Sequence, residues 1–364
     1  MIVEHLEVVD FRNYRTGSFE LHPGTTVVIG DNGHGKTNLV EALAYLATLS
    51  SFRGAPNDAL VRMGADTAVI RARVRHDDGR ELLIEAEIAR AGRNRIQINR
   101  QRLVRARDLL GTLRVTVFSP DDLVLVKGSP GDRRGLLDDT LVALATKYDA
   151  MRLELDRIVR QRNTLLKQAG GRLSEEIEVT LDVWDAKFAA LADQFGHARA
   201  TLVSRLTPMV AEAYEQLAGD AVPIEMHYEP PWRRTGLAES LRAARHVDVR
   251  RGVSTVGPHR DELALSIRGL PSRTHASQGE QRSLALALRL AAHRLVTERT
   301  GSAPVLVLDD VLSELDDHRA AALLAHLPAG QIIITTATAI PVMATVDRTL
   351  LVRNGVVGEQ PAPE

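Results

Sequence analysis

Cysteine is absent from the 364 residues of this sequence, and no apolar stretch in it is long enough to span a bilayer. The lack of cysteine excludes disulfides, thiolate zinc sites and a cysteine nucleophile. A signal peptide opens with Lys or Arg and an apolar run, whereas this chain opens Met1-Ile2-Val3-Glu4-His5, with an acid. We therefore expect a cytoplasmic protein that has no membrane partner.

The sequence also has no excess of positive or negative charge. The formal net charge is −1, so any surface for nucleic acid must be a local patch. Lysine is scarce, with five residues at positions 36, 127, 147, 167 and 187, and the other basic residues are arginine. A coding bias toward arginine explains most of this imbalance. It does not explain why one of so few lysines lies in a glycine-rich loop at position 36.

That loop, Gly30-Asp31-Asn32-Gly33-His34-Gly35-Lys36-Thr37, matches the phosphate-loop pattern G-x-x-x-x-G-K-S/T without exception. It follows a predicted strand at 27–29 and precedes a predicted helix with an apolar face. In this setting the loop N–H groups and the positive end of the helix bind phosphate. Lys36 is expected to bind the β- and γ-phosphates, and Thr37 to offer its hydroxyl to Mg²⁺. The motif and its context predict an ATP site.

Four apolar residues followed by two acids, Val305-Leu306-Val307-Leu308-Asp309-Asp310, have the form of a Walker B strand. The carboxylates of such a strand emerge beside the phosphate loop. We expect Asp309 to hold Mg²⁺ through water and Asp310 to orient or deprotonate the attacking water. Two acids after an apolar run can also begin a helix, but the phosphate loop makes that reading the less favoured one.

A third motif, Ser277-Gln278-Gly279-Glu280-Gln281-Arg282, begins a predicted helix ahead of the Walker B strand. Its S-x-G-x-Q pattern resembles the ABC signature, and the N-terminus of such a helix is an anion site. In this fold class Ser277, Gly279 and Gln281 meet the ATP of a partner chain, so the pattern predicts a homodimer that encloses two nucleotides. Residues 313–316 fit the D-loop that crosses this interface.

The long separation between the phosphate loop and the signature indicates an insertion between two half-heads. Residues 67–118 alternate apolar and polar and are predicted as antiparallel strands with turns at 77–79 and 91–92. Residues 133–219 carry apolar residues at a 4-3 spacing on both sides of Gly170-Gly171, with Ser174 as a candidate N-cap. This pattern predicts a helical hairpin, either a projecting arm or a packed helical subdomain.

We therefore predict an α/β protein: an ABC-type ATPase head with mixed sheets, split by an inserted α-helical domain. The expected segments are an N-terminal half-head at 1–118, a mainly helical insertion at 119–250 and a C-terminal half-head at 251–364. Residues 305–308 and 332–334 are expected to be buried parallel strands. The end at 361–364 is expected to fray. This arrangement resembles that of the SMC, Rad50 and RecF group.

Three segments resemble signatures of the RecF family. Residues 120–134 resemble its P-D/E-x-x-x pattern that ends in G-x-P-x-x-R-R, although Leu136 stands where the family usually has an aromatic residue. Gly257-Pro258-His259-Arg260-Asp261 resembles its G-P-H-R-D segment, and 309–316 resembles its second signature. Phe11-Arg12-Asn13-Tyr14 and Ser51-Phe52-Arg53 also lie where the family has such segments. The matches run from residue 11 to about residue 337.

The resemblance implies an ATP-dependent dimer that binds duplex DNA or a junction of single and double strands. It implies a role in the repair of single-strand gaps, in replication restart and in the SOS response, near the nucleoid. RecR and RecO proteins would be partners, and loading of the RecA recombinase would be the outcome. Arg12 and Asn13 would join the nucleotide site by the same resemblance.

Some positions depart from the usual ABC head. Asp310 is one methylene shorter than the usual glutamate, which predicts slow hydrolysis and suits a switch that ATP closes. Stimulation of this ATPase by DNA is what the resemblance implies. Thr335-Thr336-Ala337 stand where a histidine often follows the last core strand. No Q-loop glutamine is evident, and in our interpretation Asp121 or Asp122 does part of its work.

Arginines without an intervening acid fill residues 90–107: Arg90, Arg93, Arg95, Arg100, Arg102, Arg105 and Arg107. Arginine pairs with phosphate in a bidentate way, so the segment predicts contacts to the DNA backbone. Arg71, Arg73 and Arg75 alternate on a predicted strand and would extend the patch. No aromatic residue interleaves with the arginines, so base stacking is not indicated. A solvated face in an arginine-rich protein is an alternative that stays open.

Two other functions compete with a DNA-dependent ATPase switch. An ABC subunit of a transporter would share the ATP motifs, but the inserted helices and the missing Q-loop glutamine speak against it. A passive scaffold that uses ATP only to hold its fold would show no DNA-stimulated turnover. The DNA structure that is preferred, the hydrolysis rate and the partner surface do not follow from the sequence.

Overall fold

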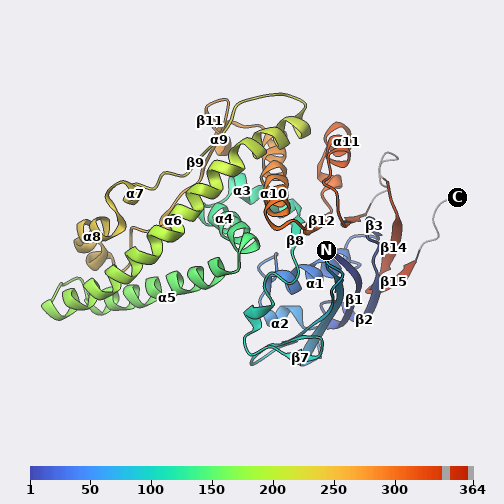
Figure 1. Cartoon of the computed structure of the whole chain (residues 1–364), viewed down its shortest axis with the longest axis horizontal. Helices are drawn as coiled ribbons and strands as arrows, with labels where there is room; N and C mark the ends of the chain where they lie inside the picture. Colours follow the sequence, from blue (N-terminus) through green and yellow to red (C-terminus); the bar gives the residue numbers. More distant parts are fainter. Residues whose placement is uncertain (338–344, 360–364) are drawn as a thin grey trace. The chain divides into compact units, whose positions relative to one another are not determined.

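Two compact units make up the chain, and the computed structural model describes residues 1–337 and 345–359 of it (Figure 1). The head unit contains Met1–Asp122, Ala213–Asp220 and Arg282–Glu364, and the helical unit contains Leu123–Glu212 and Ala221–Gln281. The head is thus built from both ends of the chain and split by a mainly helical insertion, as predicted. The three segment boundaries expected from the sequence stay a prediction. The expected frayed end at 361–364 lies outside the described residues.

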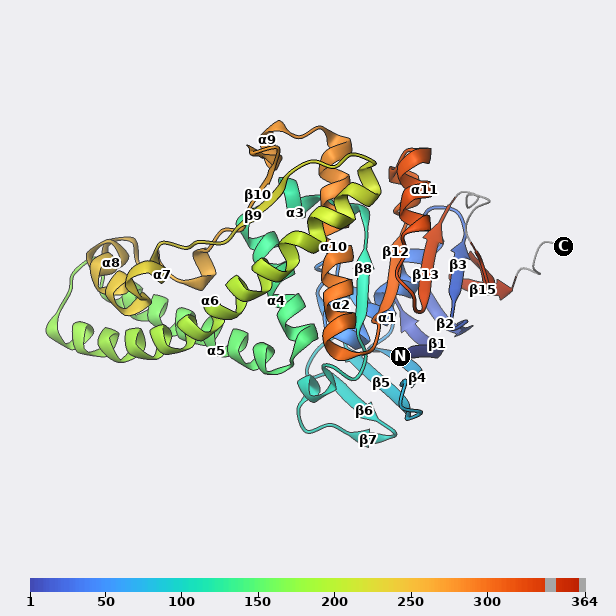
Figure 2. The ribbon, with the colours of Figure 1, turned by 45° about the horizontal axis from the view of Figure 1, so that its top comes forward.

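A six-stranded sheet of mainly parallel strands forms one layer of the head, in the order β15-β14-β3-β13-β12-β8 (Figure 2). Its strands are β3 (Thr25–Ile29), β8 (Val115–Phe118), β12 (Val305–Asp309), β13 (Ile332–Thr336), β14 (Arg348–Arg353) and β15 (Val356–Glu359). Every residue of β12 and β13 is buried, and the two strands pair in parallel. The prediction of buried parallel strands is confirmed.

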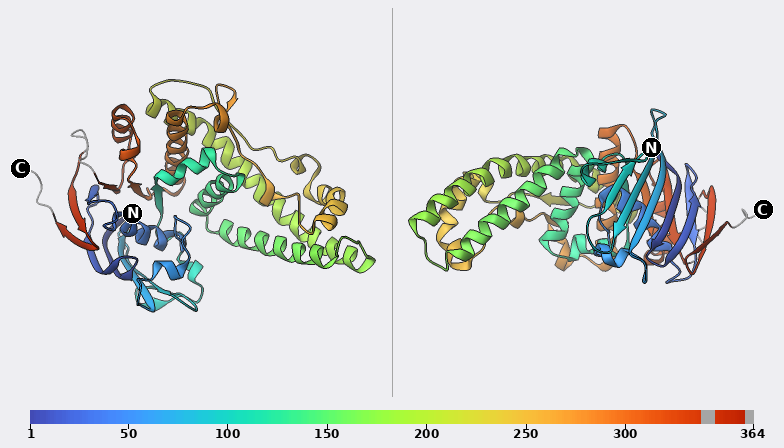
Figure 3. Two further views of the ribbon diagram at one scale, coloured as in Figure 1. Left: turned by 180° about the vertical axis from the view of Figure 1, so that it is seen from behind. Right: turned by 90° about the horizontal axis from the view of Figure 1, so that it is seen from below.

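A second six-stranded sheet is antiparallel, in the order β2-β1-β4-β5-β6-β7 (Figure 3). Its strands are β1 (Ile2–Phe11), β2 (Tyr14–Glu20), β4 (Thr67–Arg75), β5 (Glu81–Ala89), β6 (Arg95–Ile98) and β7 (Gln101–Arg102). The predicted turns at 77–79 and 91–92 connect β4 to β5 and β5 to β6. The prediction of antiparallel strands is wrong for β8, which pairs in parallel with β12. The pattern of apolar residues in so short a strand does not distinguish parallel from antiparallel pairing, and the partner strand β12 is distant in sequence.

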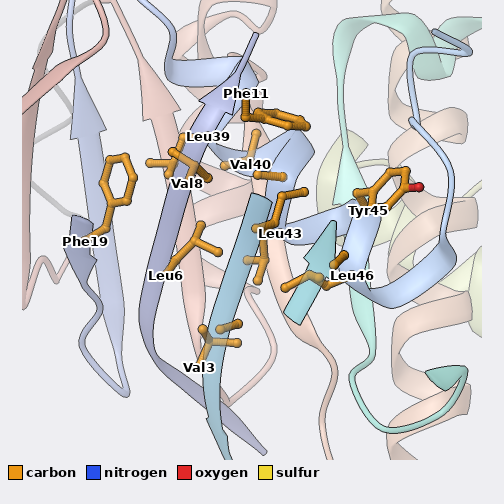
Figure 4. Packing of buried hydrophobic residues seen from close by; sticks show 14 of the residues in the cluster. Val3, Leu6, Val8, Phe11, Phe19, Leu39, Val40, Leu43, Tyr45 and Leu46 are labelled. Atoms are coloured by element: carbon orange, nitrogen blue, oxygen red, sulfur yellow. The ribbon is translucent and has the colours of Figure 1, made fainter. Parts of the chain in front are cut away.

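Helix α1 (Lys36–Thr48) lies between these two sheets, and its packing explains where the phosphate loop is held. Leu39, Leu43 and Leu46 form the predicted apolar face of α1, and they share one hydrophobic core with residues of both sheets. Figure 4 shows Leu6 and Val8 of β1 against this face of the helix. Because α1 is buried on its apolar face, its N-terminal end and the loop before it have a fixed position.

Further helices and 3-10 turns complete the head unit. They are α2 (Asn57–Leu60), α11 (Asp317–Ala325), most of α10 (Gln278–Thr300), the end of α6 (Glu175–Ala218) and 3-10 turns at Ala106–Leu109, Pro120–Leu123 and Leu312–Glu314. No helix within the described ranges 1–337 and 345–359 is both long and apolar enough to cross a membrane.

The helical unit holds the predicted hairpin. Its helices are α3 (Val124–Lys127), α4 (Pro130–Leu144), α5 (Lys147–Gln168), α6 up to residue 212, α7 (Trp232–Thr235), α8 (Leu237–Arg251) and α9 (Ser272–His275), with a 3-10 turn at Pro258–Arg260. Strands β9 (Ile224–His227), β10 (Ala264–Ile267) and β11 (Leu270–Pro271) form a small antiparallel sheet.

Helices α5 and α6 are the two arms of the hairpin (Figure 3). Gly170 and Gly171 form the turn with positive φ, and the Ser174 hydroxyl accepts a hydrogen bond from the Ile177 N–H at 3.4 Å, as an N-cap does. The first apolar series spans two helices rather than one, because Ala145 is extended and separates α4 from α5. Spacing alone did not reveal this break.

Candidate nucleotide site and DNA-binding surface

The phosphate loop leaves no space for side chains at two of its glycines. Gly35 has φ 115°, a conformation that L side chains rarely adopt, and a Cβ there would lie 2.7 Å from Asn13 Nδ2. A Cβ on Gly30 would lie 2.3 Å from the Val352 carbonyl oxygen of β14. The glycines of the motif are therefore required by the close approach of the loop to its neighbours.

Lys36 begins α1, is 6% exposed, and holds the loop together. Its ammonium group donates to the carbonyl oxygens of Gly30 at 2.7 Å and Asp31 at 3.1 Å. A buried ammonium requires acceptors, and these carbonyls supply them inside the loop. The positive charge is thereby centred where the pattern predicts the β- and γ-phosphates.

Thr37 and Asp309 meet although they lie far apart in the sequence. The Thr37 hydroxyl donates to Asp309 Oδ1 at 3.0 Å, and the Thr335 hydroxyl donates to the same oxygen at 2.7 Å. Burial raises the pKa of Asp309, and the two hydroxyl donors oppose that rise. The nearby charge of Asp310 raises the same pKa further, and that of Arg53 lowers it. The Walker A and Walker B motifs thus form one site, as the sequence predicts.

Asp310 has an unusual backbone. Its φ is 52°, in the left-handed region, and its N–H donates to both the carbonyl oxygen and the hydroxyl of Thr335, at 3.1 and 3.0 Å. Its Oδ1 is buried and has no hydrogen-bond partner in the described part of the chain. The hydrogen-bonding capacity of this carboxylate oxygen is therefore not used by the described residues.

The oxygen donors at this point fit magnesium. Thr37 offers a hydroxyl and Asp309 a carboxylate, and magnesium in proteins takes one or two carboxylates together with nucleotide phosphates and water. In the ranges that the structure describes, no group of three His, Cys, Asp or Glu could hold a metal by itself. Thr37 and Asp309 could therefore hold Mg²⁺ jointly with a nucleotide.

Arg12 and Asn13, expected at the nucleotide site by resemblance, both contact the elements that form it. The Arg12 guanidinium binds Glu41 of α1 through two hydrogen bonds of 2.8 and 2.7 Å. Asn13 donates to the His34 carbonyl oxygen at 3.0 Å. In this structure the two side chains support the loop from outside.

Three site residues were missed by the sequence interpretation. Glu41 is fully buried and binds Arg12 and Ser51. Tyr14 donates to the Gly35 carbonyl oxygen at 2.9 Å. Thr335 contacts both acids of the Walker B motif. A lone acid in an apolar helix face was a signal for Glu41. Tyr14 lies in the family-like segment 11–14 and Thr335 stands where a histidine often lies, but neither signal gave the side chain a task.

The signature segment begins α10 with a capping box. Ser277 N–H donates to Glu280 Oε2 at 2.8 Å, and the Ser277 hydroxyl accepts from the Glu280 N–H at 3.3 Å. Ser277 is exposed and Gly279 is half-buried, whereas Gln281 is 3% exposed. The Gln281 amide donates to the carbonyl oxygens of Ser272 and Arg273. Ser277 and Gly279 are thus open to a ligand, and Gln281 anchors the segment from within.

The D-loop is held by the part of α10 that belongs to the head unit. Arg282 binds the Glu314 carboxylate and donates to the Glu314 carbonyl oxygen at 2.7 Å. Asp316 caps α11 by accepting from the Arg319 N–H at 2.9 Å. Asp122, considered for the Q-loop role, is buried and ion-paired with Arg289 of α10 at 2.6 Å, and Asp121 is exposed.

The arginines predicted to bind DNA divide into paired and unpaired groups. Arg90 donates to backbone carbonyls of residues 61, 62 and 65, Arg95 pairs with Glu87 at 3.5 Å, and Arg107 has an interaction partner. The unpaired group is exposed and has no ion-pair partner among the residues that the structure describes: Arg93, Arg100, Arg102 and Arg105.

Three members of the unpaired group lie on or just after the hairpin of β6 and β7. Asn99 and Arg100 form its two-residue turn with φ of 50° and 67°. Asparagine and glycine are the usual residues of such a turn, so an arginine there is unfavourable for the backbone. Arg71, Arg73 and Arg75 do not extend this surface, because each is paired with glutamates of the same sheet.

Two family-like segments meet in the helical unit. Arg133 pairs with Glu262 at 2.8 Å, and Arg134 donates to the Asp261 carbonyl oxygen at 2.7 Å. Asp261 in turn accepts from Tyr228 and from Trp232 Nε1. The arginine pair at the end of 120–134 and the segment 257–261 therefore form a single, mostly buried polar cluster.

Comparisons with known proteins agree over nearly the whole chain. A family model described as the RecF/RecN/SMC N-terminal domain matches residues 2–356. The DNA replication and repair protein RecF of Streptomyces avermitilis is 45% identical over 352 residues, covering 93% of each chain. RecF of Paenarthrobacter aurescens is 40% identical and covers 99% of this chain and 100% of its own.

Solved structures agree with these relatives. The recombination mediator protein RecF with ATP, in the RecFOR pathway, is similar with a TM-score of 0.90 at 29% identity, over 98% of this chain and 97% of that one. An Smc head domain from Pyrococcus furiosus has a TM-score of 0.59 at 19% identity, which shows a common head fold. On this evidence the chain belongs to the RecF family of DNA replication and repair proteins.

Proposed function

We propose that this chain is an ATP-dependent DNA-binding protein of recombinational repair and replication restart, in which ATP joins two copies on DNA. The observation that carries the proposal is the meeting of the phosphate loop and the Walker B strand, with Thr37 Oγ1 at 3.0 Å from Asp309 Oδ1. The similar RecF structure that contains ATP supports it. Membership of the RecF family speaks against the transporter alternative.

Each residue of the site has a distinct task in this proposal. Lys36 and the N–H groups of residues 30–37 bind the phosphates, and Thr37 and Asp309 hold Mg²⁺, which neutralises charge on the phosphates. Asp310 orients or deprotonates the attacking water, and its free Oδ1 suits that task. The short reach of the aspartate makes hydrolysis slow, so that the ATP-bound state lasts, and DNA is expected to stimulate this slow step.

Dimerisation follows from the signature segment. Ser277 and Gly279 stand at the N-terminal end of the 23-residue helix α10, where N–H groups and the helix dipole favour an anion. We propose that this end binds the ATP held by a second copy of the chain. Gln281 contributes indirectly, because its buried amide fixes the segment.

The DNA surface is assigned to the unpaired arginines Arg93, Arg100, Arg102 and Arg105, which offer guanidinium groups to backbone phosphates. Of the other predicted contacts, Arg95 would first have to leave Glu87, and Arg107 its own partner. A duplex or a junction of single and double strands is the expected ligand. RecR and RecO proteins are proposed as partners, since similar structures belong to the RecFOR pathway. The expected location is the cytoplasm, at the nucleoid.

Sedimentation velocity with and without ATP and gapped DNA tests the proposal. The unaltered protein should sediment as a dimer with Mg·ATP and as a larger complex when gapped DNA is added. Lys36→Met should stay monomeric under all conditions, and Lys187→Met, which alters an exposed lysine of α6, should behave as the unaltered protein does. ATP-dependent dimers of Lys36→Met on DNA would contradict the mechanism. Failure of the unaltered protein to bind DNA at low salt would revive the transporter alternative. If ATP raised the melting temperature but caused neither dimerisation nor DNA-stimulated turnover, a passive scaffold would be favoured.

A further inference from the structure

Thr335 is a buried threonine near the end of an apolar strand, and its hydroxyl both donates and accepts a hydrogen bond. It lies on β13 directly beside Asp309 of β12 and is 0% exposed. The hydroxyl donates to Asp309 Oδ1 at 2.7 Å and accepts from the Asp310 N–H at 3.0 Å. Because its donor and one acceptor position are both committed, the orientation of this hydroxyl is fixed.

The hydrogen bond from the Asp310 N–H to Thr335 holds Asp310 in an unfavourable backbone conformation. A φ of 52° is costly for any residue with a side chain, so the surroundings must hold it. The Asp310 N–H binds the Thr335 carbonyl oxygen as well as the hydroxyl, at 3.1 and 3.0 Å. The backbone at residue 310 decides where the Asp310 carboxylate points, and its Oδ1 has no partner of its own in the described residues.

The hydrogen bond from Thr335 to Asp309 orients the carboxylate that is the candidate metal ligand. Two hydroxyls, those of Thr37 and Thr335, converge on Asp309 Oδ1. A hydroxyl that binds a metal through its oxygen can still donate its hydrogen to a carboxylate, so the Thr37 contact is compatible with a bound ion. Thr335 holds the same carboxylate oxygen from the neighbouring strand β13.

Folding alone gives little reason for a hydroxyl at this place. Residues 332–334 of β13 are isoleucines, and valine would match the shape and strand preference of threonine without burying a polar group. A buried hydroxyl is tolerated when its hydrogen bonds are made, and here they are made to the two acids of the site.

We propose that Thr335 is a positioning residue that aligns Asp309 for Mg²⁺ and fixes the backbone of Asp310 for water activation. The inference rests on the proposed function, since it assumes that Asp309 and Asp310 act on Mg·ATP. One hydroxyl thereby positions groups for two separate tasks, metal binding and hydrolysis.

Thr335→Val and Thr335→Ser test this role, with Thr26→Val as the matched control. Thr26 is also fully buried, lies in the neighbouring strand β3, and its hydroxyl accepts from the His22 N–H away from the acids. Four quantities are measured: kcat for ATP with DNA, KM for ATP, the Mg²⁺ concentration that half-saturates binding of a fluorescent ATP analogue, and the melting temperature.

Thr335→Val should lower kcat by about 10- to 100-fold, the effect of losing a hydrogen bond to a charged group, with KM changed by less than about 3-fold. The Mg²⁺ requirement of analogue binding should rise by about 10-fold. Thr335→Ser should recover most of both effects. Thr26→Val should lose some stability but keep kcat and the Mg²⁺ requirement.

Equal kcat and equal Mg²⁺ dependence in Thr335→Val and Thr26→Val would overturn the inference. Failure of Thr335→Ser to recover activity would do the same, because the hydroxyl would then not be what matters. If Thr335→Val does not fold, Thr335→Cys replaces it, since the thiol is only a weak donor. A protein that binds or hydrolyses no ATP before any substitution is a failure of the proposed function and is recognised separately.

Discussion

Gly35 shows how the nucleotide site depends on single atoms. It is the last glycine of the phosphate loop, and its missing side chain lets Asn13 and Tyr14 approach the loop closely. At the same scale, one hydrogen bond joins Thr37 to Asp309, and one hydroxyl joins Asp309 to Asp310 through Thr335. At this scale, the removal of a few atoms is expected to change function more than stability.

Gly35→Ala should weaken binding of a fluorescent ATP analogue by about 5- to 150-fold, the range that 1–3 kcal/mol of backbone strain allows. The physical reason is the φ of 115° and a Cβ placed 2.7 Å from Asn13 Nδ2. Gly92→Ala is the control, because Gly92 has φ 97° but open space around it. It should lower stability and leave the affinity unchanged. Equal affinity in both variants would show that the loop tolerates a side chain.

His293 links stability to pH. It is 2% exposed on α10, and burial lowers its pKa to about 4. The unfolded chain takes up a proton near pH 6.5, whereas the folded chain does not, so the free energy of unfolding falls as the pH drops from 6.5 toward 4. At pH 5 the loss should be about 2 kcal/mol for this histidine.

Urea denaturation at pH 7 and pH 5 measures that loss. His293→Gln should reduce the difference between the two pH values, and His246→Gln, at an exposed site on α8, should leave it as it is. An unchanged difference in His293→Gln would show that His293 does not account for the acid sensitivity. His259, whose pKa burial also lowers to about 4, contributes with the same sign.

At the scale of helices, Arg162 of α5 makes the buried ion pairs that join α5 to α6 and α8. It interrupts the apolar series of α5 that predicts the seam of the hairpin. In the structure it is 0% exposed and pairs with Asp185 of α6 and Asp248 of α8, both at 2.6 Å. It also donates to the Ser254 hydroxyl at 2.8 Å. A charge in the seam thus joins three helices.

Arg162→Leu should lower the free energy of unfolding by about 3–5 kcal/mol, because it leaves Asp248 buried without its cation and Asp185 with Arg245 alone. Arg157→Leu on the same helix is the control; its side chain is 63% exposed, and the change should stay within about 0.5 kcal/mol. Chemical denaturation followed by circular dichroism gives both values. A loss below about 1 kcal/mol for Arg162→Leu would mean that water or neighbouring groups satisfy the carboxylates.

Charge is arranged unevenly over the whole molecule, although its net charge is only −1. Arginines on the β1–β4 side of the antiparallel sheet are paired with glutamates, whereas those of the β6–β7 hairpin and the adjoining residues are largely unpaired. A paired arginine binds phosphate weakly, because its guanidinium group already binds a glutamate. Among the described residues of this sheet, the exposed arginines without an ion-pair partner gather at the β6–β7 hairpin and just beside it, apart from Arg15 of β2 at the opposite edge.

Replacing Arg100, Arg102 and Arg105 by Gln should make the salt dependence of DNA binding shallower by about 0.9 log unit for each DNA phosphate that is no longer neutralised. The slope is measured by fluorescence anisotropy with gapped DNA and Mg·ATP at several salt concentrations. Arg71→Gln, at a paired arginine, should keep the slope. An unchanged slope in the triple variant would place the DNA surface elsewhere and leave the nucleotide site unaffected.

Much of the ATP site could be predicted because its motifs are local. Residues 30–37 need their glycines for a tight loop, and 305–310 need apolar residues for a buried strand, so both could be read from short segments. The parallel pairing of β8, the break at Ala145 and the role of Thr335 could not be predicted this way. Each depends on a partner that is distant in sequence or on a backbone angle that many sequences share.

The sequence by itself determined that this chain has an ATP-type phosphate loop, a Walker B strand and a signature segment in the order of a split head. Glycine, lysine and carboxylate at fixed spacing are sufficient for that conclusion, because the chemistry of phosphate restricts which residues can serve. Only the tertiary structure decided which of the charges are free. Arg12, Arg71 and Arg95 have the same side chain as Arg100, but folding brings a glutamate to each of the first three, whereas Arg100 has no such partner among the described residues.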